Sequence, residues 1–515
     1  MKYNYIKYFA VLTLGLVACE PEFDNPLEDT PVEAQSSGEA NFSNYVAIGN
    51  SLTAGFADGA LYIDGQNTAF PNLLAQQMEA AGGTSDFRIP LMNDNIGGFA
   101  EANLGQEPRF KFDFATQRPV RIEDTPTTSI TTKLSGQFNN MGVPGAKSFH
   151  LLAPGYGNPA GLATEPASAN PYFVRFASSP QTTVIEDVLA QQPTFFSLWI
   201  GNNDVLGFAT SGGVGELQPA PTTTDPRMIP PPGENDISNP GYFQIIYTGL
   251  INALTVNPET QQPITNRKGI LAGIPSVTNS PFFTTVPYNP IPLDQATADA
   301  INAANNKVPA SPDESPGYNV ALLGLLQAGQ LSQEEVAKRT LNFSAGQNPV
   351  IIVDENLTAI PNLPPLRQTT PEDLLILRAS SFIGTPNEDD NTKINGISAP
   401  LADQWVLTPE EQELIAIATT AYNNIIKNLA DAGGLAYFDA NARLTELQET
   451  GIPTGDGGVA TGDLSLTSAF SLDGIHLNPR GNAIIANSMI DAINEKYGST
   501  LQKVDPSLYK TITIR

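Results

Sequence analysis

The apolar positions along this chain fall into short uncharged runs that alternate with segments of helical spacing. Four such runs cover residues 45–48, 194–200, 269–274 and 435–438. Uncharged runs of this length are typical of strands covered on both faces of a parallel sheet. Apolar residues at helical spacing follow the first run, starting at Phe70. We therefore predict an α/β fold with a parallel sheet.

Two helices near the C-terminal end are predicted from their first residues. Thr408, Pro409 and Glu411 give one of them a cap residue, a proline in the first turn and a glutamate that completes a capping box. The other follows Asn478 and Pro479. These helices flank the last predicted strand and continue the alternation of strand and helix.

The chain has 515 residues, and we interpret residues 44–498 as one enlarged domain followed by a C-terminal tail over 499–515. Two segments do not fit a compact version of the fold, namely a loop over 209–240 and a larger loop and helical insertion over about 284–405. Ligand sites of parallel sheets lie beyond the carboxyl ends of the strands. We therefore expect both segments to form walls of such a site.

The N-terminus has the pattern of a secretory signal peptide. Lys2 and Lys7 precede an apolar stretch that ends at Ala18, directly before Cys19. Leu16-Val17-Ala18-Cys19 resembles the lipobox of bacterial lipoproteins. This resemblance implies that the first 18 residues are cleaved off and that Cys19 carries a lipid. Residues 19–43 are rich in proline and acidic residues, which predicts a flexible tether.

Charge and cysteine content narrow the possible partners. The chain carries 53 acidic and 26 basic residues, a net charge of −27. Such a surface repels nucleic acid and anionic lipid headgroups, so membrane attachment is expected only through lipidated Cys19. Because Cys19 is the only cysteine, an internal disulfide is excluded. We expect the protein in the cell envelope of a Gram-negative bacterium, anchored at the outer membrane, with both a periplasmic and a surface-facing orientation left open.

The candidate chemistry begins with a serine at the end of the first predicted strand. Ser51 lies on a tight turn, a position that also suits an ordinary turn or cap residue. The chain has two histidines, and Asp473 stands three residues before His476, where it can fix the imidazole tautomer. We predict Ser51 as nucleophile, His476 as general base and Asp473 as its orienting carboxylate. His150 has no such partner nearby, and we predict a structural role for it.

Two further residues suit an oxyanion hole. Asn203 follows the second predicted strand and can offer its side-chain amide. Gly145 can bring a backbone N–H close to a substrate without a side chain in the way. Gly142, in the same segment, is an alternative to Gly145.

In this order, Ser51, Gly145, Asn203 and His476 resemble the four sequence blocks of the SGNH (GDSL-type) hydrolase superfamily. The matching segments are Gly49-Asn50-Ser51-Leu52, Gly201-Asn202-Asn203-Asp204 and Asp473-Gly474-Ile475-His476. The resemblance implies a three-layer αβα, flavodoxin-like sheet, a cofactor-free mechanism and acyl-ester substrates. It also implies that the Ser51 N–H joins Gly145 and Asn203 in the oxyanion hole. Asn50 stands where the family usually has aspartate.

We therefore expect a lipid-anchored serine ester hydrolase of the carboxylesterase, lipase or acetylesterase type. Its substrate would be an ester-containing small molecule, a lipid or an acylated glycan, with the acyl length open. The alternative is a catalytically silent surface binding protein on the same fold. Asp389-Asp390-Asn391 and the loop 455–458 lack the oxygen-rich spacing of a calcium site. We predict neither a metal nor a cofactor.

Overall fold

The computed structural model describes residues 35–102, 106–116, 118–311 and 313–512. The predicted signal peptide and Cys19 lie outside the described residues. None of the helices in the described part of the chain combines the length and the apolar character that a membrane-spanning segment needs.

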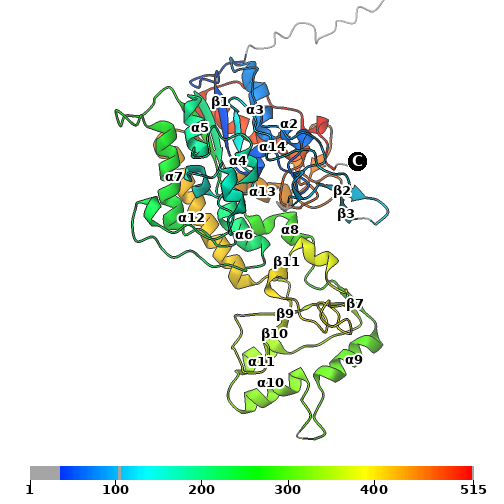
Figure 1. Ribbon diagram of the computed structural model, residues 1–515. Helices are drawn as coiled ribbons and strands as arrows, with labels where there is room; N and C mark the ends of the chain where they lie inside the picture. The colour runs from blue at the N-terminus through cyan, green and yellow to red at the C-terminus, as the bar shows by residue number, and fades with distance from the viewer. Residues whose placement is uncertain (1–34, 103–105, 117, 312, 513–515) are drawn as a thin grey trace, which may run out of the picture. The chain divides into compact units, whose positions relative to one another are not determined.

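Five parallel strands form the central sheet (Figure 1) in the order β13-β6-β5-β1-β4. They are β1 (Tyr45–Gly49), β4 (Asn140–Gly142), β5 (Phe195–Trp199), β6 (Lys268–Ala272) and β13 (Ala436–Phe438). Counted along the chain, this order is 2-1-3-4-5, which is compatible with a flavodoxin-like fold. The parallel sheet and its four predicted strands are confirmed, and β4 is an addition to them.

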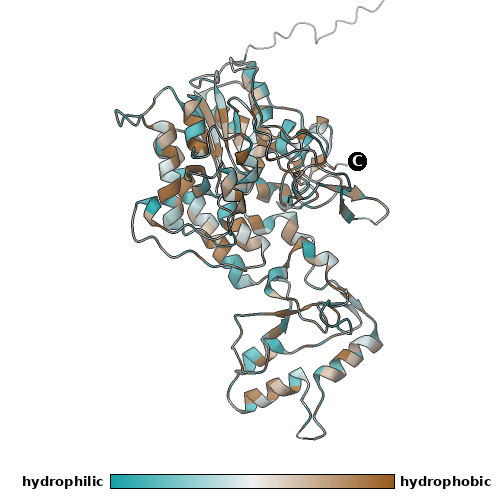
Figure 2. Ribbon diagram, in the orientation of Figure 1, coloured by the Kyte–Doolittle hydropathy of each residue, from teal (hydrophilic) through white to brown (hydrophobic). Residues whose placement is uncertain are grey.

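The strands are buried on both faces, apart from the half-buried Lys268 and Tyr437, and most of their residues are apolar (Figure 2). Along β1, Val46 and Ile48 belong to one hydrophobic cluster, whereas Tyr45 and Ala47 belong to another. The first cluster contains side chains of α5 (Val184–Ala190), α6 (Asn203–Thr210), α7 (Pro240–Thr255) and α12 (Pro409–Gly433). The second contains side chains of α3 (Phe70–Glu79), α13 (Ala440–Glu449) and α14 (Pro479–Tyr497). Helices therefore cover both faces of the sheet.

The ends of α12 and α14 follow the predicted signals. Thr408 and Glu411 form the capping box of α12, and Gly434 ends this helix in the left-handed conformation at a φ of 62°. The Asn478 side chain caps α14 by accepting the N–H of Gly481. Both predicted helix starts are confirmed.

The packed part of the chain extends beyond the boundaries expected from sequence. Phe42 is 1% exposed and lies against Phe195 of the sheet, with ring centroids 5.0 Å apart. At the other end, Leu501 and Val504 are buried in the cluster that α14 contributes to. Residues 35–43 and the start of the C-terminal tail are therefore part of the fold, because isolated apolar residues within these polar segments reach the core.

The remaining elements lie in the connections and in the insertion. The connections contain α1 (Ser51–Ala54), α2 (Ile63–Asn67), α4 (Pro171–Val174), α8 (Pro281–Thr284), β2 (Phe110–Asp113), β3 (Arg118–Arg121), β14 (Ile452–Pro453) and β15 (Val459–Ala460). The insertion and its flank contain β7 (Ile291–Leu293), α9 (Gln295–Asn305), α10 (Tyr318–Gln327), α11 (Gln333–Arg339), β8 (Gly346–Asn348), β9 (Ile351–Val353), β10 (Leu366–Gln368), β11 (Leu374–Leu375) and β12 (Val406–Leu407). Here β7–β8, β9–β10 and β11–β12 pair antiparallel. This region therefore has strands as well as the predicted loops and short helices.

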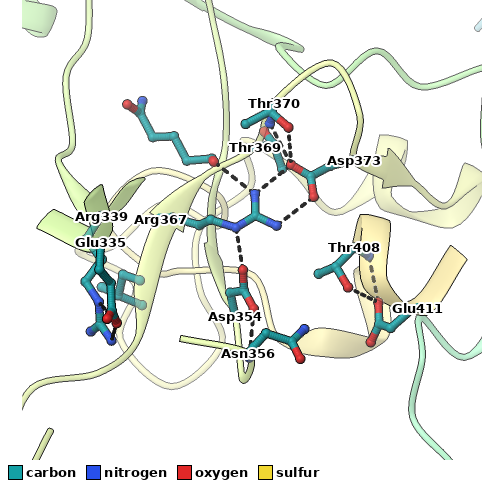
Figure 3. Close-up of polar contacts among 12 residues, drawn as sticks. Glu335, Arg339, Asp354, Asn356, Arg367, Thr369, Thr370, Asp373, Thr408 and Glu411 are labelled. Carbon is teal, nitrogen blue, oxygen red and sulfur yellow. Dashed lines mark hydrogen bonds and ion pairs between the residues drawn. The ribbon is translucent and has the colours of Figure 1, made fainter. Parts of the chain in front are cut away.

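A buried cluster of side-chain ion pairs connects separate segments of the insertion (Figure 3). The Arg367 guanidinium makes a bidentate contact with Asp373, at 2.6 and 2.7 Å, and a third bond to Asp354. Asp373 also accepts the backbone N–H of Thr370 at 2.6 Å. All three charged side chains are less than a tenth exposed, so the buried Arg367 charge is paired within the protein, by two carboxylates around one guanidinium.

Candidate active site

The chain turns sharply between β1 and Ser51. Gly49 ends β1 so close to β5 that an added Cβ would lie 2.4 Å from the Trp199 carbonyl oxygen. The Asn50 side chain then accepts the Leu52 N–H at 3.1 Å and caps α1. This places Ser51, the first residue of α1, at the carboxyl edge of the sheet.

Ser51, His476 and Asp473 form a continuous hydrogen-bonded chain. The Nε2 atom of His476 lies 2.9 Å from Ser51 Oγ, and its Nδ1 atom lies 3.0 Å from Asp473 Oδ2. The Phe56 ring packs against the imidazole, with centroids 4.7 Å apart. Ser51 is 7% exposed, and the His476 and Asp473 side chains are 12% and 11% exposed. The structure thus brings together three residues that sequence reasoning grouped across more than 400 positions.

Asp473 is held as a carboxylate by its surroundings. Its Oδ1 accepts the backbone N–H groups of Ile475 and His476 at 2.9 and 2.8 Å, and its Oδ2 accepts the Gly59 N–H at 2.8 Å. Burial alone would raise the pKa of Asp473, but the neighbouring His476 and these hydrogen bonds outweigh it and hold the pKa below its ordinary value. The carboxylate can therefore orient the imidazole and stabilise its protonated form.

Asp58 is a part of the site that sequence reasoning missed. Its backbone N–H donates to Ser471 Oγ at 2.9 Å, and its Oδ1 accepts the Leu472 N–H at 3.0 Å. Burial and then the charge of Asp473 raise its pKa to about 6. Asp58 thus joins the turn after α1 to the loop that carries Asp473. The Asp-Gly pair at this position indicates a turn, but no sequence signal links it to a residue so far along the chain.

Asn203 is the first residue of α6, and residues 200–202 connect it to the carboxyl end of β5. Its Nδ2 donates one hydrogen to the Ala146 carbonyl at 2.8 Å, which leaves the second amide hydrogen for another acceptor. Asn203 lines the same pocket as Ser51 and His476. Its amide is therefore fixed in the wall of the cavity that the predicted nucleophile also lines.

The two glycines proposed for the oxyanion hole differ in their backbone. The Gly142 N–H is already donated to Asn140 Oδ1 at 3.0 Å. Gly145 is exposed, has a φ of 79°, and its N–H has no partner among the described residues. It adjoins Ala146, which receives the Asn203 bond, but Gly145 itself does not line the pocket. Of the two, Gly145 keeps a donor available.

An apolar cavity of about 80 Å³ adjoins Ser51 and His476. Its walls come from residues 275–280, from α13 and from α14. No lining residue belongs to 209–240 or 284–405, so the prediction that these segments wall the site is wrong for this cavity. One reason is that α6 separates Asn203 from the first segment by a helix of about 12 Å. Residues 275–280 precede the second segment in the chain, and they line the cavity where that segment does not.

His150 takes no part in this arrangement. Its Nδ1 accepts the Lys147 N–H at 3.0 Å, and its ring stacks on Tyr156 with centroids 4.5 Å apart. Burial, with a smaller contribution from Lys147, lowers its pKa to about 3. His150 is a neutral packing residue, which agrees with the structural role predicted for it.

Glu355, Asp403 and Glu411 form a separate carboxylate cluster that offers oxygen ligands within 4.8 Å of one another. Such ligands suit hard cations. Glu411 is 5% exposed, and its Oε1 has no partner among the described residues. Burial raises the pKa of Glu411 most, and the charges of Asp403 and Glu355 raise it further. The hydrogen bonds from Thr408 (Figure 3) oppose this shift, and the resulting pKa is about 7. The cluster does not include residues that line the Ser51 cavity.

The raised pKa of Glu411 predicts a pH-dependent stability. Its stabilising protonated form is fully present below the ordinary pKa and is lost as the pH rises through about 7. Glu411→Gln is therefore expected to raise the free energy of unfolding at pH 8 by about 1 kcal/mol, after allowance for solvent screening, with little change at pH 4. Urea unfolding at both pH values tests this. Glu410→Gln, at an exposed position of the same turn, is the control, and an equal effect of Glu411→Gln at both pH values would contradict the prediction.

Comparison of the chain with models of known protein families, with curated proteins and with solved structures finds no significant match.

Proposed function

We propose that the protein is a serine ester hydrolase in which Ser51 is the nucleophile. The observation that carries this proposal is the hydrogen-bonded chain from Asp473 through His476 to Ser51, with distances of 3.0 and 2.9 Å. Acyl transfer to a serine needs a nucleophile, a base and an orienting carboxylate that lie within hydrogen-bonding distance of one another.

The mechanism follows from these contacts. Ser51 Oγ attacks the carbonyl carbon of the ester while His476 Nε2 takes its proton. The tetrahedral intermediate collapses, and the same nitrogen returns the proton to the leaving alcohol. His476 Nε2 then takes a proton from water as the water attacks the acyl-serine, and returns that proton to Ser51 Oγ as the carboxylic acid is released. Asp473 stabilises the imidazolium in both halves of the reaction.

Three donors are available for the negative oxygen of the intermediate. The Ser51 N–H is in the first turn of α1 and has no acceptor within this helix. The second amide hydrogen of Asn203 and the N–H of Gly145 complete the set. None of these steps requires a cofactor.

The SGNH resemblance gives the finer form of the proposal. Ser51 follows β1 and Asn203 follows β5, two adjacent strands at the point where the sheet order reverses. This is where open α/β sheets bind ligands. We infer an SGNH-type αβα domain that carries the region 284–405 as an insertion. The lipobox pattern at Cys19 supports a lipid-anchored enzyme at the outer membrane of a Gram-negative bacterium, acting on an ester-containing small molecule, lipid or acylated glycan.

The experiment that tests the proposal is the hydrolysis of p-nitrophenyl butyrate by the purified protein. We expect turnover well above that of buffer. A folded protein without turnover would favour the alternative, a surface binding protein that keeps the fold and lacks activity. The intact chain of hydrogen bonds at Ser51 favours the enzyme, because binding alone does not require it.

Asn203→Ala is expected to lower kcat by a factor of about 10² to 10³. The lost amide acts on the developing oxyanion, so KM should change much less than kcat. Steady-state kinetics with p-nitrophenyl butyrate measure both constants. An increase in KM with an unchanged kcat would instead assign Asn203 to substrate binding.

A further inference from the structure

We propose that Asp204 is a positioning residue of the active site, which holds the loop of Gly145 and the amide of Asn203 in a fixed geometry relative to each other. The inference rests on the proposed ester hydrolase activity and adds a residue on which that same site depends. The observations that carry it are the hydrogen bonds of the Asp204 carboxylate and the segments that these bonds connect.

Asp204 lies in the first turn of α6, directly after Asn203, and it is fully buried. Its Oδ2 accepts the backbone N–H of Ser148 at 2.8 Å, and its Oδ1 accepts the hydroxyl of Ser148 at 2.8 Å. Oδ1 also accepts the hydroxyl of Ser238 at 2.7 Å. All three of these hydrogens come from outside α6, and two of them come from the residue three positions after Gly145.

The same loop carries a positive charge that compensates Asp204. Lys147 is 4% exposed, and its Nζ donates to the carbonyl groups of Gly233 and Asp236 at 2.7 and 2.8 Å. Burial raises the pKa of Asp204, and the charge of Lys147 opposes this rise. A buried carboxylate needs hydrogen-bond donors and a nearby opposite charge, and residues 147–148 supply both. The loop therefore cannot move away from α6 without leaving a buried charge uncompensated.

These contacts connect two of the oxyanion donors. The Asn203 Nδ2 donates to the Ala146 carbonyl at 2.8 Å, directly after Gly145 in the chain. This bond joins α6 and the loop at one point, and the bonds from Ser148 to Asp204 join them at a second point, which fixes their orientation. Donors in such a site must keep their positions to within about 0.5 Å. Asp204 is not among the residues that line the active-site cavity, so it acts through Asn203 and Gly145.

The test compares Ser148→Ala with Ser238→Ala in steady-state kinetics with p-nitrophenyl butyrate. Both serines are fully buried, and each variant removes one hydroxyl hydrogen bond to the same Asp204 oxygen. Only Ser148 belongs to the loop of Gly145. We expect Ser148→Ala to lower kcat about five- to tenfold with little change in KM, and Ser238→Ala to stay within about twofold of the wild type. Both variants should lower the midpoint of urea unfolding by similar amounts, so stability does not account for the difference in kcat.

A double-mutant cycle of Asp204→Ala with Asn203→Ala gives a second readout. Asp204→Ala alone should lower kcat by a factor of about 10², because both donors lose their fixed positions. The loss should be smaller when Asn203 is already alanine, since one of the two donors through which Asp204 acts is then absent. A residue that supports only the fold would cause the same loss in both backgrounds. If Asp204→Ala does not fold, Ser148→Ala takes its place in the cycle, with the same expected sign.

The possible failures are distinguishable. If the wild-type protein does not hydrolyse p-nitrophenyl butyrate, the proposed function fails and the positioning role fails with it. If the wild-type protein is active and Ser148→Ala keeps its kcat, the positioning role alone is overturned. Equal losses of kcat in Ser148→Ala and Ser238→Ala, or losses that multiply independently in the cycle, overturn it as well.

Discussion

Ser51→Ala is expected to lower kcat/KM for ester hydrolysis by a factor on the order of 10⁴ or more. The variant loses the attacking oxygen while the oxyanion donors remain, so the residual rate reflects binding and electrostatics alone. Initial rates with p-nitrophenyl butyrate measure the effect. Because the Ser51 hydroxyl is hydrogen-bonded to His476 and carries no other hydrogen bond within the described residues, the free energy of unfolding should change little.

The matched control is Ser43→Ala, at an exposed serine just before the same strand. It should retain wild-type activity. Activity of Ser51→Ala within tenfold of the wild type would mean that another group performs the attack, and the mechanism would have to be abandoned.

Asp473→Asn is expected to lower kcat by a factor on the order of 10³ to 10⁴. An amide at this position can hold the imidazole in the wrong tautomer and cannot stabilise its positive charge. Because the pKa of Asp473 is held below its ordinary value, the wild-type carboxylate stays ionised in the neutral range, and the loss should be visible at pH 7. Steady-state kinetics of the two proteins at that pH provide the measurement.

Asp58→Asn separates this role from simple disruption of the loop. The asparagine keeps a carbonyl oxygen for the Leu472 N–H. The residue it replaces is not hydrogen-bonded to His476, whose Nδ1 contacts Asp473 instead. Its effect on kcat should be far smaller than that of Asp473→Asn. Equal losses in the two variants would indicate that both aspartates only support the loop.

The sheet could be predicted largely from local pattern. Four of its strands are uncharged runs, apart from the half-buried Lys268 at the start of β6, and this pattern suits burial on both faces. The fifth, β4, is three residues long and starts at Asn140, so it lacks that pattern. The Asn140 side chain is satisfied by the Thr53 carbonyl and the Gly142 N–H, contacts that exist only in the folded chain.

The hydrogen-bonded set of Ser51, His476 and Asp473 could be predicted because few residue types perform the chemistry proposed for it. With two histidines in the chain, the aspartate three positions before His476 was sufficient to choose between them. The residues that support the site have no comparable signal in the sequence. The Gly59 N–H reaches Asp473 across 414 positions, and the cavity walls combine α13 with α14 and the segment 275–280. Such contacts depend on tertiary packing.

The central claim is that Ser51 is an activated nucleophile, and one measurement tests it most directly. The folded protein is treated with a fluorophosphonate, digested, and analysed by peptide mass spectrometry. We predict a covalent adduct on Ser51 that is absent when the protein is unfolded before treatment, because His476 then no longer activates the hydroxyl. An adduct on a different residue, or none on Ser51 in the folded protein, would contradict the account.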